Sequence, residues 1–559
     1  MIRSKDRRQK ELMDFIPWGT ERHHKMLKGS IYHTFRKDIL PNIPIHFFSK
    51  HFSEEFGRPT KDLQSVVGLF ILQALRDMTD LEAIEAYCLN DGFRYALDIS
   101  RSEYISERSY YYYRAKILGE GSNVFNKVLA SITKRLELDA ALQRTDSTMV
   151  QANLARMSKL ELFSTTIKKF LTELRQAHPI VYGRLDQELR DRYLPAKETS
   201  WFASNKPSQY KEILLTAAKE VLGLIERFKD HPSASQLPAF ALLVRLAEEQ
   251  IVKNGEEVVV QVNQETKGSA MTNPHDPDAH YNGHYEKVGY KADFTEACGN
   301  DKDTPHPKIV TQVSVHPANT SDKTTILDTV GALEDKGLKP QTLLADNGYD
   351  SDDNQQGCVE RDVELVCPPS GAPADGFGVM DFARTEDNTI ISCPMEQQCI
   401  ENIVHSGHKK TVSYFDPARC RECPHSHDCP VKITKRKARL EWDWKKPRIE
   451  ARRRMFAEDP ETKALYRQRA GGESAFSVAK RKLGLNRLRR RGQEKATLSI
   501  FLAATALNVL RMHNWLVWCL LFLQFSKISS LCMCFRGLKF RFFKNRIKIF
   551  PNRPQACFC

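Results

Sequence analysis

The sequence predicts an α/β protein whose mixed sheet is interrupted by a helical insertion and by a cysteine-rich insertion. Residues 288–294 and 309–315 are rich in β-branched and apolar side chains with the spacing of strands. Residues 324–336 then form a short amphipathic helical pattern, so strands are followed by a crossover helix, as in a mixed sheet. Residues 60–135 and 155–254 instead have helical periodicity.

Residues 1–140 predict a helical N-terminal domain. Thr79 and Glu82 have the spacing of a capping box, and Ser106 is a second N-cap candidate. Several short helices with basic and aromatic residues suit DNA binding of the helix-turn-helix type. A helical bundle without a DNA-binding role fits the same pattern equally well.

Residues 141–385 are predicted to hold the sheet. Leu142–Val150 has the composition of a buried strand, and its one acid is Asp146. The helical insertion at 155–254 follows and carries no recognisable motif. Strand patterns resume near Glu257.

After the predicted crossover helix the chain continues the sheet and then changes character. Thr342–Ala345 form a strand candidate that ends at Asp346, in an Asp-Asn-Gly turn. Residues 386–454 predict a cysteine-rich and then basic insertion. Residues 455–512 return to helical patterns that complete the core, and residues 513–559 form an aromatic and basic tail with no predicted place in the sheet.

The composition indicates a polyanionic partner. Lys and Arg number 84 against 70 Asp and Glu, which gives a formal net charge of +14, and such a surplus suits the phosphates of a nucleic acid. Met1–Lys10 is charged, and the apolar run Trp515–Phe525 has about half of the roughly 20 residues that a membrane helix needs. We therefore expect a cytoplasmic protein without a membrane partner.

Three acids are candidates for phosphoryl-transfer chemistry: Asp146 in a strand, Asp346 just after a strand, and Glu473 on a helix. Two-metal catalysis needs carboxylates that converge from separate elements, and Mg²⁺ or Mn²⁺ prefers such oxygen ligands. An acid in a buried strand is costly unless it is paired or metal-bound. The alternatives are a salt-bridged strand acid, ordinary turn chemistry, and a solvated helix charge.

The last long helix is predicted to begin with Asp459 as its N-cap and Pro460 at its first position. A further helix is expected over Thr497–Met512. Within the first of these helices, Gly471 and Gly472 should each weaken the helix by roughly 1 kcal/mol. They would alternatively permit close approach of another backbone or of DNA.

Four residues of this helix are spaced to share one face: Tyr466, Arg469, Glu473 and Lys480, within roughly 60° of one another. Glu473 would then bind metal, while Arg469 and Lys480 would hold DNA phosphates. A solvated charged stripe is the alternative interpretation.

These motifs together resemble the DDE transposases of bacterial insertion sequences. The resemblance rests on Asp146-Ser147-Thr148, on Ala345 to Ser351, and on Tyr-x₂-Arg-x₃-Glu-x₆-Lys, the signature of one large superfamily of these enzymes. The regions around Asp276–Ala279 with Val288–Ala292, and Gly484–Gly492 with Asn508, are also similar. The resemblance spans roughly residues 45–512.

The resemblance implies a ribonuclease-H-like core with Asp146, Asp346 and Glu473 as catalytic, magnesium-binding residues. Tyr466, Arg469 and Lys480 would contact DNA near the terminal nucleotides. In the family, metal-activated water cleaves the transposon end, and the freed 3′-hydroxyl then attacks target DNA. Terminal inverted repeats, target DNA and a second copy of the chain are the implied partners. A nuclease without strand transfer and an inactive DNA-binding protein are the alternatives.

Four cysteines in the insertion have spacings that suit a structural zinc site: Cys393, Cys420, Cys423 and Cys429. Cysteines without metal fit the spacing about as well. The basic stretches Lys432–Arg454, with Trp442 and Trp444, and Lys480–Arg491 are predicted to follow a DNA backbone. Solvated charge runs are the alternative.

Overall fold

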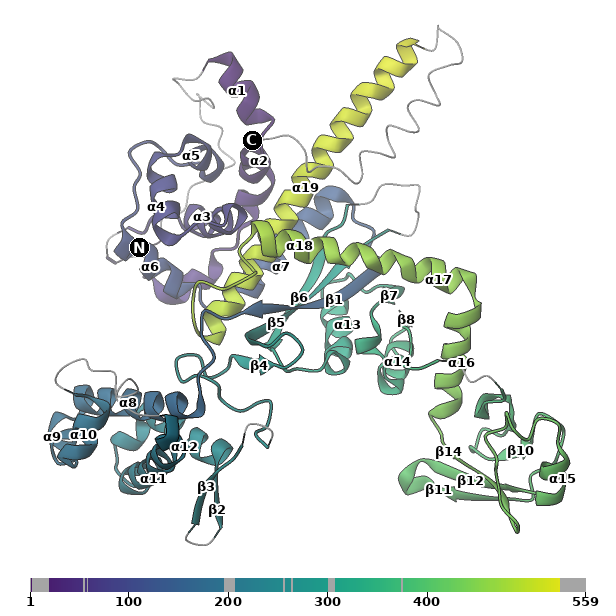
Figure 1. Cartoon of the computed structure of the whole chain (residues 1–559). Helices are drawn as coiled ribbons and strands as arrows, with labels where there is room; N and C mark the ends of the chain where they lie inside the picture. The colour runs from purple at the N-terminus through teal and green to yellow at the C-terminus, as the bar shows by residue number, and fades with distance from the viewer. Residues whose placement is uncertain are drawn as a thin grey trace.

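A mixed sheet lies at the centre of the protein (Figure 1). The structure, a computed structural model, describes residues 2, 20–53, 56–57, 59–195, 207–254, 257–262, 265–299, 307–372 and 376–532. The strands of the central sheet are β1 (Leu142–Gln151), β4 (His280–Asn282), β5 (Lys287–Ala297), β6 (Val310–Pro317), β7 (Thr342–Leu344) and β8 (Glu364–Val366).

The order of this sheet is β4-β5-β1-β7-β8, and β6 also pairs with β5. Strands β1, β5 and β6 are antiparallel neighbours, whereas β7 is parallel to β1 and β8 is parallel to β7. The predicted α/β class is therefore confirmed. Because parallel neighbours end at the same edge, the residues that follow β7 lie beside the second half of β1.

Helices from both ends of the chain pack on one another beside the sheet. The N-terminal helices are α1 (Glu21–Lys28), α2 (Ile31–Thr34), α3 (Leu63–Arg76), α4 (Asp80–Leu89), α5 (Asp91–Leu97), α6 (Glu107–Lys116) and α7 (Gly121–Leu136), with η1 (Phe35–Ile39), η2 (Leu40–Asn42) and η3 (His46–His51) between them. As predicted, Thr79 caps α4 in a capping box with Glu82, and Ser106 caps α6. Helices α3 and α7 contact the C-terminal helix α19 (Gln493–Cys532), and their apolar faces share one core with β5 and β6.

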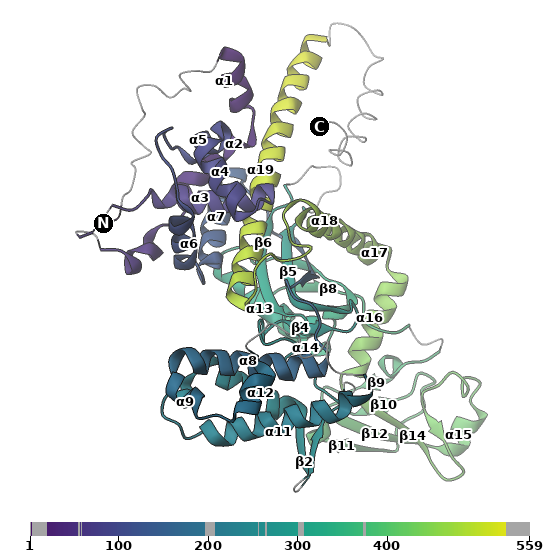
Figure 2. The same cartoon turned by 60° about the vertical axis from the view of Figure 1, so that its left-hand side comes forward.

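A separate helical arm is inserted between β1 and β4 (Figure 2). It consists of α8 (Lys159–Ala177), α9 (Pro179–Gly183), α10 (Gln187–Tyr193), η5 (Pro207–Gln209), α11 (Tyr210–Phe228), η6 (Ala234–Gln236), α12 (Pro238–Gln250) and a hairpin of β2 (Ile251–Asn254) with β3 (Glu257–Val260). The arm has its own apolar core, centred on Phe163, Phe170 and Leu243. The hairpin carries the insertion past the predicted end at residue 254.

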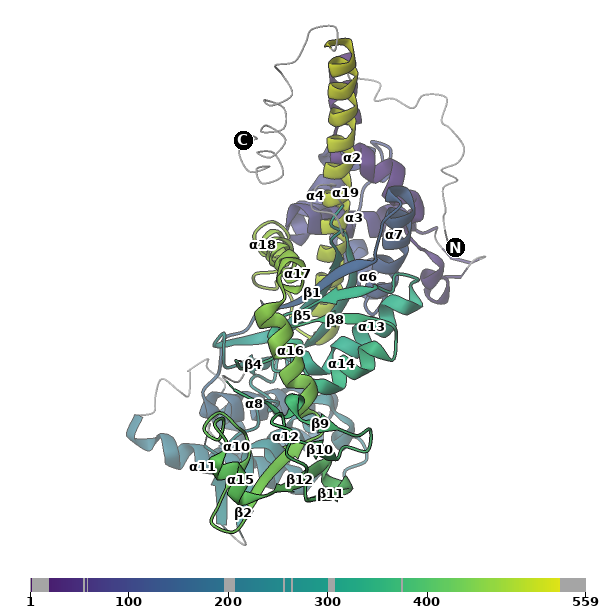
Figure 3. The same cartoon turned by 90° about the vertical axis from the view of Figure 1, so that its right-hand side faces the viewer.

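The cysteine-rich segment forms a small β module at the far end of α16 (Lys446–Glu458) (Figure 3). It contains η9 (Val379–Asp381), β9 (Ala383–Arg384), β10 (Ile390–Ser392), β11 (Glu401–His405), η10 (Ser406–His408), β12 (Lys410–Phe415), α15 (Pro417–Glu422), β13 (Lys432–Ile433) and β14 (Ala438–Asp443). Val379 and Phe382 belong to its core, so the module begins before the predicted boundary at 386. It ends at β14, and α16 leads back toward the sheet.

The sheet is covered on both faces. On one side lie η7 (Asp322–Thr324), α13 (Ile326–Asp335), η8 (Asn347–Tyr349) and α14 (Asp352–Val359); on the other lie α17 (Pro460–Tyr466), η11 (Arg467–Gly472) and α18 (Glu473–Lys482) (Figures 1 and 3). Asp459 caps α17 as predicted, accepting hydrogen bonds from the amides of Glu461 and Thr462. The prediction of one continuous helix is wrong, because a 3₁₀ segment separates α17 from α18.

The last helix is longer than the predicted Thr497–Met512, because α19 extends from Gln493 to Cys532. The predicted start of the tail at residue 513 therefore falls inside this helix, and residues 533–559 lie outside the described residues. By length and composition Gln493–Phe522 would suffice to cross a membrane, but 67% of the relevant window is buried inside the protein. A core helix that is mostly buried inside a protein passes the same test of length and composition.

Candidate active site

Two of the predicted acids lie together at one edge of the sheet. Asp146 is in β1 opposite Phe294, and the amide of Ser147 donates a 2.9 Å hydrogen bond to its Oδ1. Asp346 follows β7 and caps η8, where the amide of Gly348 donates to its Oδ1 at 2.8 Å. Since β7 is parallel to β1, the two carboxylates come from neighbouring strands.

The pKa of Asp146 reflects its burial and the acids near it. Burial raises the pKa of Asp146 to about 6, and the charges of Asp346 and Asp322 act in the same direction. The Ser147 amide and the Arg469 guanidinium oppose the shift. A carboxyl group with a pKa near 6 is poorly solvated and close to other acids, which is an environment typical of functional sites.

Arg469 provides the cation at this site. Its Nη1 lies 3.3 Å from Oδ2 of Asp146, and both side chains are about one-fifth exposed. The guanidinium carbon also lies 5.8 Å from the ring centre of Tyr466. Of the predicted residues, Arg469 therefore contacts Asp146 directly, and Tyr466 lies next to Arg469. The sequence had predicted a DNA phosphate, and not an acid of the protein, as the partner of Arg469.

A buried ion cluster holds the η11 segment against the sheet. Arg144 of β1 donates to Glu296 of β5, with Nε at 2.7 Å, and to the backbone carbonyl of Gln468 at 2.6 Å. Arg511 of α19 completes the cluster by pairing with Glu296. A β-carbon on Gly471 would overlap the Arg144 guanidinium, so this glycine permits the close approach. The same contact explains why the helix is interrupted here.

Glu473 and Lys480 are not brought into contact with the two acids. Glu473 is the first residue of α18, and its side chain is exposed. The preceding Gly472 lines a small hollow with Asp146 and Arg469, so the backbone at Glu473 is close to the site. Lys480 is partly buried near Lys287, and burial followed by this like charge lowers its pKa.

No compact metal-ligand group is formed by these residues. In the described part of the chain, no three His, Cys, Asp or Glu side chains are gathered closely enough to hold a metal ion. Mg²⁺ commonly uses only one or two protein carboxylates, with water and substrate phosphates completing its shell. The oxygen donors of Asp146 and Asp346 fit that mode of binding, whereas a three-carboxylate cage is not present.

Sequence reasoning missed three polar residues on the sheet face opposite to Asp146: Asp293 on β5, His316 on β6 and Asp322 of η7. His316 Nε2 lies 3.5 Å from Oδ2 of Asp293, and the charge of Asp322 is among those that raise the pKa of Asp293. Asp293 shares β5 with Lys287, Lys291 and Glu296, so a search for a lone acid in an apolar strand would not have selected it.

Other motif residues have structural roles. Asp276 is fully buried, accepts a 2.6 Å hydrogen bond from the hydroxyl of Tyr290, and accepts another from the Gly492 amide at 2.9 Å. The side chain of Asn508 hydrogen-bonds the backbone N–H and C=O of Val310, which ties α19 to β6. These residues fix the sheet against its helices.

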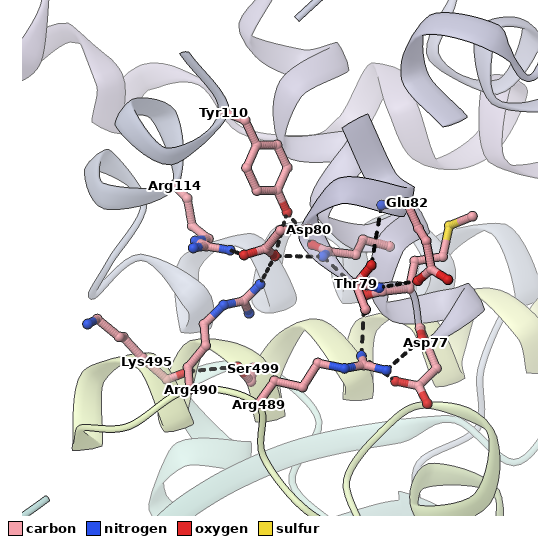
Figure 4. Close-up of polar contacts among 12 residues, drawn as sticks. Asp77, Thr79, Asp80, Glu82, Tyr110, Arg114, Arg489, Arg490, Lys495 and Ser499 are labelled. Carbon is pink, nitrogen blue, oxygen red and sulfur yellow. Dashed lines mark hydrogen bonds and ion pairs between the residues drawn. The ribbon is translucent and has the colours of Figure 1, made fainter. Parts of the chain in front are cut away.

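Much of the predicted DNA-tracking charge is paired within the protein. Figure 4 shows Arg489 directed at Asp77, with Nη1 2.6 Å from Oδ1, and Arg490 paired with Asp80. In the other basic stretch, Arg448 pairs with Asp352. Trp442 lies in the core of the β module, and Trp444 donates to the hydroxyl of Thr411. The two tryptophans therefore do not form an exposed stacking surface.

The four predicted zinc cysteines all belong to the β module, but among the described residues no three of them are gathered closely enough to hold a metal ion. Burial raises the pKa of Cys420 to about 11, and Cys429, Cys393 and Cys423 act in the same direction, so the four sulfurs are within electrostatic range. All four are free and partly exposed. Cys393, Cys420 and Cys429 pack against the core that contains Trp442.

Residues 392–513 match a family model described as a transposase DDE domain.

The matched range contains most of the β module, the segment from α16 to α18, and the first half of α19. It includes Tyr466, Arg469, Glu473 and Lys480 and lies after Asp146 and Asp346. No curated protein matches the chain. The match supports a DDE transposase, and hence an enzyme that processes nucleic acid.

Proposed function

We propose that this chain is a transposase that cleaves DNA at transposon ends and joins the ends to target DNA, using a divalent cation. The observation that carries the proposal is the convergence of Asp146, Asp346 and Arg469. Two acids come from neighbouring parallel strands, and the arginine comes from the segment that matches the transposase DDE domain. The sheet order β6-β5-β1-β7-β8 is the frame that we assign to the ribonuclease-H-like core.

Mg²⁺ or Mn²⁺ bound by these acids would activate an attacking oxygen and stabilise a leaving oxygen. Asp146 and Asp346 supply the hard oxygen donors, and burial limits the water around Asp146. We assign Glu473 to the same site on family resemblance. It directly follows Gly472, which lines the hollow beside Asp146.

We assign Arg469 and Tyr466 to contacts with the DNA. A cation held by Asp146 would release the Arg469 guanidinium, which would then hold a phosphate near the scissile bond. Tyr466 packs edge-on against Phe456, and the Arg469 guanidinium lies over its ring. We assign Lys480 to DNA backbone contact further along α18.

The partners in this proposal are double-stranded DNA and a second copy of the chain. The terminal inverted repeats and the target DNA would meet the basic residues that are not paired internally. The β module would be held by a structural zinc ion bound to Cys393, Cys420, Cys423 and Cys429, because a module with so small a core gains from such a staple.

An assay with purified full-length chain tests this function. A supercoiled plasmid carrying the DNA that flanks the chain's own coding sequence is incubated with Mg²⁺ or Mn²⁺, and the cleavage positions are mapped. A precut end with a free 3′-hydroxyl is added separately to target plasmid. We expect metal-dependent cuts at the repeat boundaries and joined products. Cuts without joining would identify a nuclease, and binding without cuts would identify an inactive DNA-binding protein.

A further inference from the structure

The β13–β14 hairpin of the β module carries a dense group of cations. Residues 432–439 contain no acid and five basic residues, all of them exposed, which we call the hairpin cations: Lys432, Lys435, Arg436, Lys437 and Arg439. Among the described residues, none of the five takes part in an ion pair. The next acid along β14, Glu441, lies 3.8 Å from Lys410 of β12 instead.

The other half of this basic stretch is used inside the protein. Arg448 of α16 pairs with Asp352 of α14 at 2.5 Å. Nη2 of Arg454, at the end of α16, lies 2.6 Å from Oδ2 of Asp381 in the β module. These pairs fix α16 between the sheet and the module. Cations with a structural role thus have an acid beside them, whereas the hairpin cations have none among the described residues.

Two hairpin cations lie directly opposite each other on the small sheet. Lys432 of β13 pairs in register with Arg439 of β14, so both side chains are on the same face. This face is turned away from the core of the module, because Ala438 and Leu440 on either side of Arg439 are buried. Like charges directly opposite each other destabilise a sheet. An anion bound between the two side chains would remove this repulsion.

Tyr414 extends this face by one strand. It lies on β12 directly opposite Arg439, and its side chain is half-buried. Nζ of Lys437 lies 5.5 Å from the centre of its ring. Lys432, Arg439 and Tyr414 therefore form one row across three strands, and Glu401 of β11 ends the row on the far side of Tyr414. Ammonium, guanidinium and phenol groups are the donors that proteins commonly use to bind the phosphates of DNA.

The turn of the hairpin holds its cations in fixed positions. The amide and the hydroxyl of Thr434 both donate to the carbonyl of Lys437, at 2.7 Å and 2.8 Å. The amide of Lys437 donates to the same hydroxyl at 3.0 Å. Nη2 of Arg421 on α15 lies 3.4 Å from the carbonyl of Lys435, which brings a further exposed cation to the turn. A surface that is ordered before binding loses less entropy when it binds.

The helix α16, whose 13 residues span about 20 Å, connects the β module to the helices beside the candidate active site (Figure 1). We propose that the β13–β14 hairpin, together with Tyr414, binds the phosphate backbone of duplex DNA at a distance from the bond that is cut. This inference rests on the proposed function and adds a second DNA contact to it. Phosphate contacts fix the position of a duplex without reading its sequence. The hairpin therefore takes the role that the sequence had assigned to the whole stretch Lys432–Arg454 and its tryptophans.

The salt dependence of DNA binding by the full-length chain tests the inference. Binding of a fluorescent duplex of random sequence is followed by anisotropy over a series of NaCl concentrations without divalent cations. Each neutralised phosphate contributes about 0.9 to the slope of log K against log salt, so Lys432→Gln with Arg439→Gln should lower the magnitude of the slope by about 2. Lys168→Gln with Lys219→Gln, two exposed lysines of the helical arm, is the matched control and should keep the wild-type slope.

A charge-conserving variant separates lost charge from lost structure. Lys432→Arg with Arg439→Lys should keep the wild-type slope, because both positive charges remain. An equal loss of slope in this variant and in the glutamine variant would contradict a contact based on charge.

The outcomes also separate this inference from the proposed function. A wild-type slope in the glutamine variant, with DNA cleavage by the wild type, would overturn the inference and leave the function standing. A lowered slope in a protein that does not cut DNA would support the hairpin contact while the proposed function fails.

Chemical modification of lysines provides a second measurement that needs no variant. An amine-reactive reagent is applied to the wild type with and without saturating duplex, and the extent of modification is measured by mass spectrometry. Bound DNA should protect Lys432, Lys435 and Lys437, whereas Lys219 should react equally in both samples. Equal modification of the three hairpin lysines with and without DNA would contradict the proposed contact.

Discussion

Nη1 of Arg469 lies 3.3 Å from Oδ2 of Asp146, which joins the helix segment of the Tyr-Arg-Glu-Lys pattern to the acid of the central strand. The two residues are 323 positions apart in sequence. The pair places a cation where the proposed chemistry needs a divalent ion. In the proposed function, Arg469 would give up Asp146 to a metal ion and would then be available for DNA.

Replacing Arg469 with alanine should reduce DNA cleavage much more than stability. We expect cleavage to fall about 100-fold, because a charge-stabilising donor is lost from the site. The partly exposed ion pair should contribute only about 1 kcal/mol to folding. Cleavage kinetics and urea unfolding are measured on Arg469→Ala and on Arg467→Ala, whose side chain is exposed. Equal cleavage rates in the two variants would remove Arg469 from the site.

Gly471→Ala should destabilise the protein by roughly 2–4 kcal/mol. The new methyl group would overlap the guanidinium of Arg144, which cannot move without opening its buried pair with Glu296. Gly223→Ala is the control, because Gly223 lies inside α11 with open space around it. That change should stabilise α11 by about 0.5–1 kcal/mol. Equal unfolding midpoints for the two variants would show that η11 is not held by Arg144.

Asp80 should make the protein sensitive to acid. Burial alone would raise the pKa of Asp80. This pKa is instead lowered from 3.8 to about 2 by hydrogen bonds from Arg114 and Gln73 and by the charge of Arg490 (Figure 4). Because the folded state has the lower pKa, this stabilisation is complete above about pH 4. It is lost as the pH falls from 4 to 2, and it amounts to about 2 kcal/mol at most.

The measurement is urea unfolding of the wild type and Asp80→Asn between pH 2.5 and 7. The difference in stability should be present at pH 7 and shrink toward pH 2.5. Glu85→Gln, an exposed site on the same helix, should show no such change. A difference independent of pH would refute the contribution of the ionised Asp80.

Zinc should be present at one ion per chain and should depend on the β-module cysteines. Burial keeps the free thiol of Cys420 protonated, so binding of zinc must displace protons, and affinity should rise with pH. Cys420→Ser with Cys423→Ser should lose the metal, while Cys88→Ser in the N-terminal helices should keep it. Metal analysis of the purified proteins decides this, and a zinc-free wild type would end the assignment.

Local chemistry made several elements predictable. A single acid in an apolar run identified β1 and Asp146, and side-chain caps identified the starts of α4, α6 and α17. Such features depend on neighbours within a few residues, so they are visible in the sequence.

Long-range contacts were not predictable. The 3₁₀ segment η11 depends on Arg144, which is 324 positions from Gln468, and the pairing of Arg489 with Asp77 spans 412 positions. Asp293 could not be singled out in the sequence, because Lys291 and Glu296 are further charged residues of the same strand. The helix α19 continues beyond Met512 through a run of apolar residues. No recognised motif includes these residues, so the sequence did not predict that the helix extends through them.

The most direct test of the account compares wild type, Asp146→Asn, Asp346→Asn and the control Asp335→Asn, an exposed acid on α13, in Mg²⁺-dependent cleavage of DNA carrying the flanking repeats, with repeat binding followed in the same samples by gel shift. We predict that the first two variants bind the repeats normally and lose cleavage by at least about 1000-fold, while Asp335→Asn cuts like the wild type. Wild-type cleavage by either Asp146→Asn or Asp346→Asn would contradict the central claim that these two carboxylates act together on DNA.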